Sequence, residues 1–350
     1  DFQVTIQAQN RAGRPANVST DTDISLTRVL TGTGSLTGNT TGTILAGQNQ
    51  VTISGVRYSI SEYLQIEASR TSGDLLRADT SAVILAASAF YSNVEGNGDP
   101  AIHTNWNSER DGSGSPPPAG ALAGLFIIQA DDTMRTVAIF SEYDVVLRIE
   151  NGGAFFNNTG TTELGSLIIE GGGLAIANSE IEISSNGNFT IHNNGTYIHN
   201  NTARLDEAEA LYSGSENFAE NSQFIVLQLS TIAGSLNTFS TASFGNLTLN
   251  LTANTANLSF NGNLTEVKGD AENYTLAIGG DFRITGGTIY LMDANAQCTI
   301  NIGGDWIISG GEVRVTDGTG DPIVNIENNL VISGGTLNLS AVTGGVSTIY

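Results

Sequence analysis

The segment GGDFRITGGTIYLMDANAQCTINI, residues 279–302, is followed by GGDWIISGGEVRVTDGTGDPIVNI, residues 303–326, and by ENNLVISGGTLNLSAVTGGVSTIY, residues 327–350. Each segment is 24 residues long. Its apolar residues occur in pairs two positions apart, which is the periodicity of a β-strand. A Gly-Gly pair separates two of these apolar pairs, where the backbone can turn with positive φ at no steric cost. A period in the twenties with short strands and glycine turns is typical of a β-solenoid.

Aligned in register, the three segments place apolar residues in common columns. We expect these columns to stack roughly 4.8 Å apart inside a parallel β-helix that has about three short strands per coil. Cys298 has the parity of the buried positions, so it is predicted to point into the core. The columns are Phe282, Trp306 and Leu330; Ile284, Ile308 and Ile332; Ile289, Val313 and Leu337; Leu291, Val315 and Leu339; Leu276, Ile300 and Val324; and Ile278, Ile302, Ile326 and Tyr350.

Similar apolar pairs recur from residue 125 onward. The pair at residues 167–169 returns at 189–191, a spacing of 22 residues. At roughly 23 residues per coil, residues 120–350 would form about ten coils. Residues 200–223 lose the alternation and hold many charged side chains, so we expect a loop that projects from the rod. The predicted fold is therefore all-β, with a parallel β-helix of about 22–24 residues per coil over residues 89–350.

Residues 1–88 have a different pattern. About seven short alternating segments, separated by turn residues, predict a β-sandwich. The run TGTGSLTGNTTGTILAGQNQVTISGVRY, residues 31–58, resembles the bacterial Ig-like repeats of large secreted surface proteins. In that family a V-x-I-x-G-V-x-Y strand recurs, and residues 51–58 read VTISGVRY. The resemblance implies an Ig-like spacer or adhesive module.

Residues 89–123 join the two parts and contain Phe90-Tyr91-Ser92, Trp106 and a run of prolines at 116–118. Composition alone is typical of a linker. The order of these features resembles a segment found in proteins exported by the type IX secretion pathway, where it leads into a β-helix. The resemblance implies a cap on the first coil that buries Trp106, with Phe90 and Tyr91 packed beside it. The alternative is a flexible linker.

The charge balance excludes some classes of partner. The chain has 35 Asp and Glu against 13 Lys and Arg, a formal net charge of −22. Contacts with phosphate need clustered cations, so nucleic acid and acidic membrane surfaces are not expected partners. The apolar runs are shorter than the roughly 18 residues that span a bilayer. No signal peptide is visible, residue 1 is Asp and no polar cap follows Tyr350, so we expect a mature product or a segment of a longer protein.

Few residues suggest chemistry. Polysaccharide lyases and hydrolases on β-helices need clustered carboxylates, or calcium bound by carboxylates beside Arg or Lys. Asp131 and Asp132 lie in a predicted turn, and their side chains should point apart. His192 and His199 are seven residues apart without a third ligand, so packed or solvated histidines are expected rather than a metal pair. No catalytic residue is predicted. An ice-binding face would need flat threonine ladders, and Glu312 interrupts one of them.

The remaining carboxylates stack by the repeat itself. Asp281, Asp305 and Asn329 form one column, and Asp293 and Asp317 form another. Such residues after turn glycines accept hydrogen bonds from local backbone. The alternative is calcium held between stacked carboxylates, which makes these four aspartates the candidates for a metal site. No other cofactor is expected.

The leading hypothesis is a non-catalytic structural or adhesive segment of a large secreted cell-surface protein, located outside the cell. The type IX resemblance implies export by that pathway, although the C-terminal sorting domain of such cargo is not in this chain. One alternative is carbohydrate binding or cleavage, with the 200–223 loop lining the cleft. Another is a self-assembling extracellular fibre subunit. The expected partners are secretion machinery, cell-surface components, glycans or like subunits.

Overall fold

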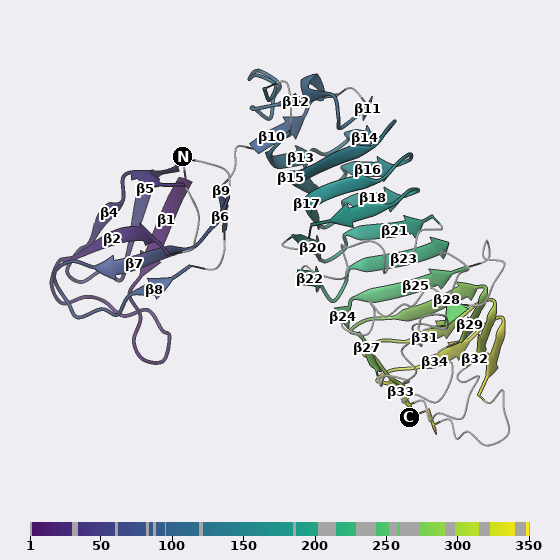
Figure 1. Ribbon diagram of the computed structural model, residues 1–350. Coiled ribbons are helices and arrows are strands. Elements are labelled where there is room, and N and C mark those ends of the chain that lie inside the picture. The colour runs from purple at the N-terminus through teal and green to yellow at the C-terminus, as the bar shows by residue number, and fades with distance from the viewer. Residues whose placement is uncertain are drawn as a thin grey trace, which may run out of the picture. The chain divides into compact units, whose positions relative to one another are not determined.

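The computed structural model describes residues 2–29, 34–59, 62–81, 84–86, 89–94, 96–118, 122–184, 187–201, 215–228, 243–251, 258–259, 274–290, 298–314, 323–339 and 348–349. The chain divides into two compact units, residues 1–88 and residues 89–350 (Figure 1). Within the described ranges the regular elements are β-strands, apart from one short 3₁₀ helix, η1 (His103–Asn105). No helix in these ranges is long and apolar enough to cross a membrane.

Unit 1 is a small sandwich of antiparallel sheets. Leu26 of the four-stranded sheet shares a buried cluster with Ile53 and Val56 of the three-stranded sheet, so the alternating faces of the two sheets form a common core. The three-stranded sheet has the order β1 (Phe2–Gln7), β5 (Gln50–Tyr58), β3 (Leu36–Gly38); the four-stranded sheet has the order β4 (Thr41–Ile44), β2 (Thr22–Arg28), β7 (Ile66–Arg70), β8 (Asp79–Thr80); and β6 (Glu62–Leu64) pairs with β9 (Ile84–Ala86).

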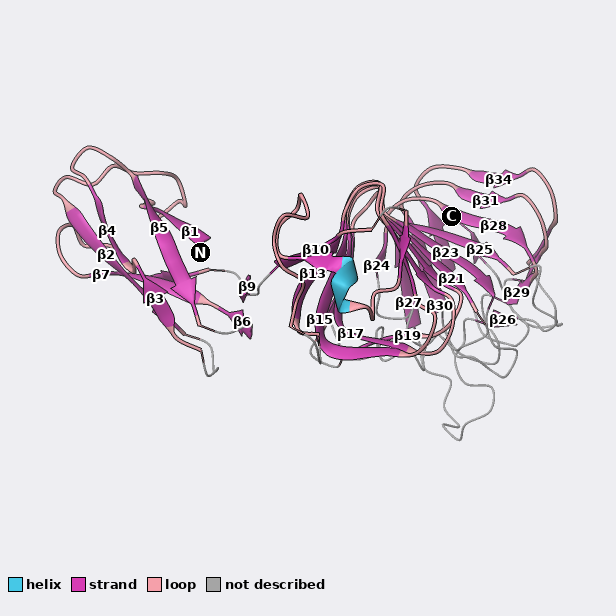
Figure 2. Ribbon diagram, turned by 90° about the horizontal axis from the view of Figure 1, so that it is seen from above, coloured by secondary structure: helices cyan, strands magenta, loops and turns pink. Residues whose placement is uncertain are grey.

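Unit 2, called the solenoid below, is a parallel β-helix. Its ten-stranded sheet, the long sheet, runs the length of the described coils, and Figure 2 shows the later strands of this sheet, β21 to β34, following one another in order when seen from above. The strands of the long sheet are β11 (Asn97–Gly98), β14 (Thr133–Arg135), β16 (Ala154–Asn157), β18 (Leu174–Ala177), β21 (Thr196–Asn200), β23 (Gln223–Gln228), β25 (Asn246–Asn250), β28 (Phe282–Gly286), β31 (Trp306–Ile308) and β34 (Leu330–Ile332).

Three further sheets complete the coils. The eight-stranded sheet covers the first coils, and the smaller two cover the last. Its strands are β12 (Trp106–Asn107), β10 (Ala89–Ser92), β13 (Gly124–Ile128), β15 (Phe140–Ile149), β17 (Thr162–Ile169), β20 (Asn188–Ile191) and β22 (Ser215–Phe218), with β19 (Ile181–Ile183) beside β17. The five-stranded sheet consists of β24 (Ser243–Phe244), β27 (Tyr274–Ile278), β30 (Cys298–Ile302), β33 (Ile323–Ile326) and β36 (Thr348–Ile349). The four-stranded sheet of the solenoid consists of β26 (Leu258–Ser259), β29 (Thr288–Tyr290), β32 (Glu312–Arg314) and β35 (Thr336–Asn338).

The predicted columns are confirmed in register where the structure describes them, although Leu330, Ile332 and Leu339 in the last described coil are exposed rather than buried. Phe282 pairs with Trp306, and Trp306 pairs with Leu330, in adjacent parallel strands. The rings of Phe282 and Trp306 are fully buried and stack with centroids 6.2 Å apart at an angle of 9°. The other confirmed columns are Ile284, Ile308 and Ile332; Ile289, Val313 and Leu337; Leu276, Ile300 and Val324; and Ile278, Ile302 and Ile326. Leu291, Val315, Tyr350 and the Cys298 side chain lie outside the described residues.

The segment predicted to cap the first coil packs against it through Trp106 and Phe90. Strand β12 pairs with β10, and Trp106 is 1% exposed within the solenoid core. Its indole N–H donates to the carbonyl of Pro100 at 2.8 Å, and its ring meets Phe126 edge to face at 5.0 Å. Phe90 stacks on Phe126 as expected. Tyr91 has the opposite parity in β10, so it lies outside the core cluster and packs under the guanidinium of Arg110.

The loop predicted over residues 200–223 is wrong in its second half. Residues 215–218 form β22, which pairs in register with β20, and residues 223–228 form β23 in the long sheet. The chain therefore returns to the solenoid eight residues before the predicted end of the loop. Residues 202–214 lie outside the described residues.

The glycine turns of the last coils have positive φ as predicted. Gly287, Gly311 and Gly335 have φ of 88°, 76° and 74°. A Cβ on Gly311 would lie 2.3 Å from the carbonyl oxygen of Gly287 in the adjacent coil, closer than any real contact. These positions therefore require glycine for two reasons, the backbone conformation and the approach of the next coil.

We predict that Gly311→Ala destabilises the solenoid by roughly 3 kcal/mol, because it adds a steric clash to the cost of positive φ. Gly96→Ala is the control, since Gly96 also has positive φ but its Cβ would meet nothing within 4 Å. That variant should lose only about 1 kcal/mol. Urea unfolding followed by near-ultraviolet circular dichroism measures both changes, and equal losses would contradict the steric argument.

Candidate functional site

A polar pocket of about 310 Å³ opens where the cap meets the first coils. The cap contributes Ser92, Asn93, Val94, Arg110 and Asp111 to its lining. The coils contribute Gln129, Ala130, Asp132 and Glu150. Among the predicted residues only Asp132 belongs to this group, so the pocket joins chain segments that sequence spacing does not connect.

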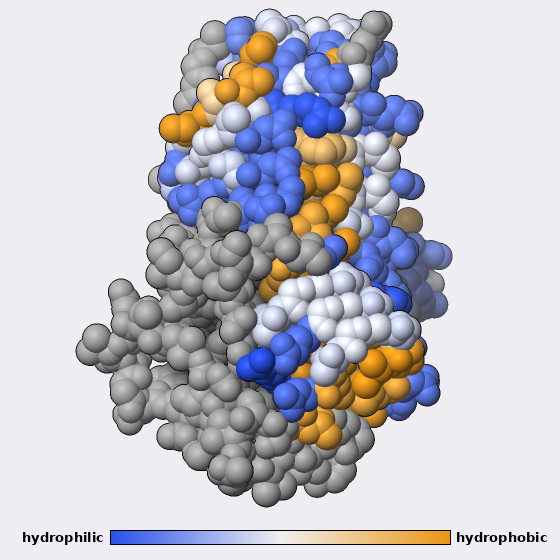
Figure 3. Space-filling model, turned by 90° about the vertical axis from the view of Figure 1, so that its right-hand side faces the viewer, coloured by the Kyte–Doolittle hydropathy of each residue, from blue (hydrophilic) through white to orange (hydrophobic). Residues whose placement is uncertain are grey.

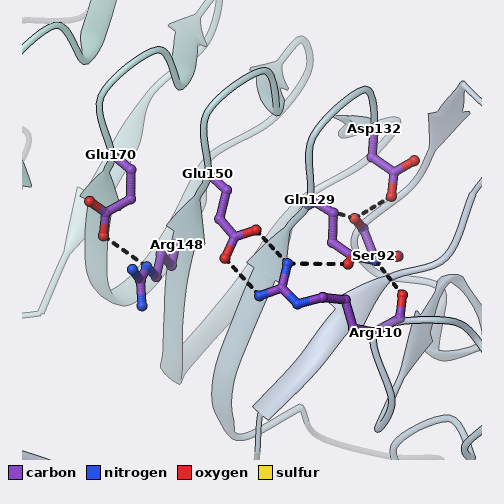
Figure 4. Close-up of polar contacts among 7 residues, drawn as sticks. All are labelled: Ser92, Arg110, Gln129, Asp132, Arg148, Glu150 and Glu170. Carbon is purple, nitrogen blue, oxygen red and sulfur yellow. Dashed lines mark hydrogen bonds and ion pairs between the residues drawn. The ribbon is translucent and has the colours of Figure 1, made fainter.

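Ser92 is the buried centre of the pocket. Its hydroxyl donates to the Asp132 carboxylate and accepts the backbone N–H of Gln129 at 2.8 Å. The Gln129 side-chain amide donates to the carbonyl oxygens of Ser92, at 2.7 Å, and Arg110, at 3.1 Å. Strand β10 and the cap loop are therefore bonded to the coil corner that follows β13 (Figure 4).

Charged residues continue along the same corner of the solenoid. Glu150 and Glu170 follow paired residues of β15 and β17, so their side chains stack in adjacent coils. Arg110 holds both oxygens of Glu150, at 2.6 and 2.8 Å. Arg148 pairs with Glu170 at 2.8 Å (Figure 4). Each glutamate thus has its own arginine, which offsets the repulsion that stacking like charges would produce.

The two carboxylates of the pocket have opposite pKa shifts. Burial raises the pKa of Asp132, and Asp131 adds to the effect, although the hydrogen bond from Ser92 opposes it. The pKa of Glu150 is lowered, chiefly by its hydrogen bonds from Arg110. Carboxyl groups whose pKa values are pushed apart are the arrangement that acid/base catalysts use. Here, however, the oxygens of Glu150 are occupied by Arg110.

Asp281, Asp305 and Asn329 form a ladder of another kind. Oδ1 of Asp281 accepts the backbone N–H of Asp305 at 2.9 Å, and Oδ1 of Asp305 accepts the backbone N–H of Asn329 at 3.1 Å. The expected bonds to backbone are therefore present, but the donor belongs to the next coil rather than to the same turn. Asp281 is also paired with Arg283. The other calcium candidates, Asp293 and Asp317, lie outside the described residues.

We predict that Asp305→Asn leaves stability nearly unchanged, because its amide oxygen can still accept from Asn329. Asp305→Ala removes the acceptor and should cost about 1 kcal/mol. Thermal unfolding with added calcium or with EGTA tests the alternative. The hydrogen-bond ladder predicts the same midpoint in both solutions, whereas a calcium-dependent rise that Asp305→Asn abolishes would establish the metal site.

The histidines do not converge. His199 faces the core and is 3% exposed, whereas His192 lies at the exposed corner, 3.8 Å from Glu170. His199 has the inward parity of Tyr197 within β21, whereas His192 lies in the turn that follows β20. Among the described residues no three His, Cys, Asp or Glu side chains gather closely enough to hold a metal ion.

Glu216 is a titratable group that sequence reasoning missed. In β22 it pairs with Phe189, so it continues the inward column of Leu147 and Leu167. Its Oε1 atom is buried and accepts no hydrogen bond from the described residues. Burial raises its pKa to about 7. Alignment of residues 215–218 with residues 188–191 would have revealed the acidic residue in an apolar column, but the intervening chain hides that register.

Glu216 predicts a pH dependence of stability. Its folded-state pKa lies above the ordinary value of 4.5, so the unfolded chain loses the proton first, and stability falls as pH rises from about 4.5 to about 7 and then levels off. Glu216→Gln should therefore be more stable than the wild type at high pH by about 1 kcal/mol, a value reduced for solvent screening. At pH 4 the two proteins should be equal. Urea midpoints across this range test the sign, and a variant that is less stable at high pH would contradict it.

Comparison with known proteins finds no matching protein family, no matching curated protein and no matching solved structure. Functional interpretation therefore rests on the residues and their geometry.

Proposed function

We propose that this chain is a non-catalytic structural and adhesive segment of a large secreted cell-surface protein, in which an Ig-like module precedes a β-helical rod. The proposal extends to export by the type IX secretion pathway. The resemblances of residues 31–58 and 89–123 support it. So does the cap: the segment that resembles the type IX cargo buries Trp106 over the first coil, as a rod-starting segment should.

The observation that carries the non-catalytic assignment is how the pocket uses its charged groups. Arg110 binds both oxygens of Glu150, and Ser92 donates to Asp132 while it accepts from Gln129. These bonds tie the cap to the coils. A catalytic acid or base would need an oxygen free to reach a substrate proton. The pocket therefore supports a clamp that holds the end of the rod closed.

A second candidate is carbohydrate cleavage at the same pocket. The opposite pKa shifts of Asp132 and Glu150 favour it, because glycosidases use one protonated and one ionised carboxyl group. In this alternative Asp132 would be the acid, and a substrate would have to displace Arg110 from Glu150. The 200–223 segment, which sequence reasoning placed along a cleft, does not line the described pocket.

One experiment separates the candidates. The chain is incubated with a panel of polysaccharides, and the products are analysed by mass spectrometry, with Asp132→Asn as the matched control. We expect no shortened chains from either protein. Product that the wild type forms and Asp132→Asn does not would overturn the non-catalytic assignment.

A second measurement addresses location. Protease added to intact source cells should digest the protein, and disruption of the type IX translocon should protect it inside the cell. Protection in cells with an intact translocon would contradict the surface assignment.

A further inference from the structure

The strands of the long sheet carry no acidic residue. Strands β11 to β34 of this sheet contain no Asp or Glu, and Arg135 and Arg283 are their only lysine or arginine residues. The whole chain, by contrast, has 35 Asp and Glu. The adjoining eight-stranded sheet holds carboxylates in β15, β17, β19 and β22. Acidic groups are therefore kept off the described strands of this face, while Asp281 and Asp305 lie in the turns directly before β28 and β31.

An apolar ladder occupies the centre of that face. Phe156 pairs with Ile176, Ile176 pairs with Ile198, and Ile198 pairs with Ile225 in successive strands. All four alternate with buried residues, so they point outward, and each is half-buried by its neighbours in the ladder. Figure 3 shows an orange, hydrophobic stripe on this side of the solenoid, with hydrophilic surface beside it. Contiguous outward aliphatic side chains of this kind mark interaction surfaces more often than scattered ones do.

Polar amides border the ladder on one side. The Asn178 amide donates to Oδ1 of Asn158 at 2.9 Å, and the Asn200 amide donates to Oδ1 of Asn178 at 2.7 Å. These bonds align the amides in a row parallel to the apolar stripe. An apolar centre with an uncharged polar rim is the anatomy of a protein–protein interface. Aliphatic side chains dominate the centre of the face. Neutral sugars are held mainly by aromatic rings and hydrogen-bonding groups, so the face suits a protein partner better than a sugar.

We propose that the outer face of the long sheet is a homodimer interface, against which the same face of a second copy of this chain packs. Two chains of formal charge −22 repel each other over most of their surfaces. The carboxylate-free face is where they can approach without bringing acidic groups together. The proposal rests on the solenoid alone and does not depend on the proposed surface function.

The charges also select the orientation of the dimer. A two-fold axis along the rod would place Arg135 against its own copy. A two-fold axis perpendicular to the rod, between β18 and β21, instead sets Arg135 opposite Thr248, which follows Ile225 in the ladder. Ile176 of each copy then faces Ile198 of the other. Isologous contacts of this type close after two copies.

The size of the face implies a weak dimer. Six strands, β14 to β25, overlap in this arrangement, and at about 4.8 Å per strand they cover about 29 Å along the rod. With a width of about 14 Å, each copy contributes about 400 Å² of projected area, or about 800 Å² for the pair. This lies below the roughly 1,000 Å² that a stable specific interface buries and within the range of weak, transient contacts. Association should therefore be reversible and visible only as concentration rises.

Sedimentation velocity of the full chain over roughly 1 to 200 μM tests the proposal. We expect a monomer–dimer equilibrium that tightens with added salt, because screening reduces the repulsion between the two acidic chains. Ile198→Glu should weaken the dimer at least 100-fold, since each copy then buries an unpaired carboxylate. The matched control is Ile168→Glu on the eight-stranded sheet, which should leave the dimer unchanged. Thermal unfolding checks that both variants fold.

A double variant tests the orientation. Ile176→Lys combined with Ile198→Glu sets a cation opposite a carboxylate twice across the perpendicular axis, so the dimer should return. A chain that stays monomeric throughout the concentration range overturns the proposal. A dimer that Ile198→Glu leaves intact also overturns it, because such a dimer would form by another contact, for example by end-to-end stacking of the rods. Binding of a neutral glycan by a strictly monomeric chain, lost in Ile198→Glu, would assign the face to carbohydrate instead.

Discussion

Stacking of like residues at a fixed interval is the constraint on which this structure depends. Each paired strand residue of the described solenoid has a counterpart about 4.8 Å away in the next coil. Apolar side chains gain contacts from that arrangement, as the stacked rings of Phe282 and Trp306 do. The same arrangement destabilises charged side chains, because like charges stacked in a ladder repel one another. The repeating carboxylates must therefore be neutralised one at a time.

The solenoid uses two solutions to this problem. At the corner beside the cap, Glu150 and Glu170 each bind a separate arginine. In the last coils, Asp281 and Asp305 each accept the backbone N–H of the next coil. The second solution needs no additional side chain. It converts a stack of negative charges into a chain of hydrogen bonds that also fixes the register of neighbouring coils, which explains why the same position can repeat an acidic residue.

The turns obey the same constraint through their backbone. In the first coils the backbone has positive φ at one equivalent turn position, occupied by Asp131, Gly152, Gly172 and Asn194. The N–H of each of the first three residues donates to the carbonyl of the equivalent residue in the next coil. A Cβ on Gly152 would have its nearest contact at 3.6 Å, and one on Gly172 would meet only the Asn151 side chain at closer than 3.6 Å, so the backbone leaves room for a side chain in this turn. Asp and Asn tolerate the left-handed conformation and can replace glycine here.

The later turns are tighter, and their composition follows. A Cβ on Gly311 would lie 2.3 Å from a carbonyl oxygen of the adjacent coil. Backbone conformation alone would admit Asn or Asp, but the approach of the next coil would not. This close approach explains why glycine recurs at the turn that follows the long sheet in all three C-terminal repeats. The turn that precedes the long sheet, which corresponds to that of Gly152, is less uniform there too, and Glu327-Asn328 replaces Gly-Gly in the third repeat.

The regularity of the repeat determined what could be predicted. The three segments of 24 residues aligned without gaps, so the internal columns and the glycine turns followed directly. Upstream, Phe156, Ile176 and Ile198 are separated by 20 and 22 residues, and Ile225 follows after 27. The unequal lengths of these coils concealed the outward ladder, and they also concealed Glu216 and β22.

The pocket could not be predicted for a different reason. Ser92 meets Asp132 across 40 positions of the chain, and Arg110 meets Glu150 across the same distance. One member of each pair belongs to the cap, which lies outside the repeat, so no periodicity relates the two. The resemblance of residues 89–123 to a capping segment located Trp106, because burial of a large aromatic ring is a property of the residue itself. It carried no information about which coil residue Arg110 would reach.

Period-two alternation allows the inside and outside of each strand to vary independently. The inward residues must preserve the dry core, whereas the outward residues can change without disturbing it. The eight-stranded sheet places Glu142, Glu163 and Glu182 on its strands, and burial raises the pKa of Glu142. The long sheet excludes such groups from every strand. Because the same core supports both sheets, the stability of the fold does not require this asymmetry. The proposed contact with a second copy on the outer surface accounts for the strands that carry no acidic residue, whereas the packing of the coils does not.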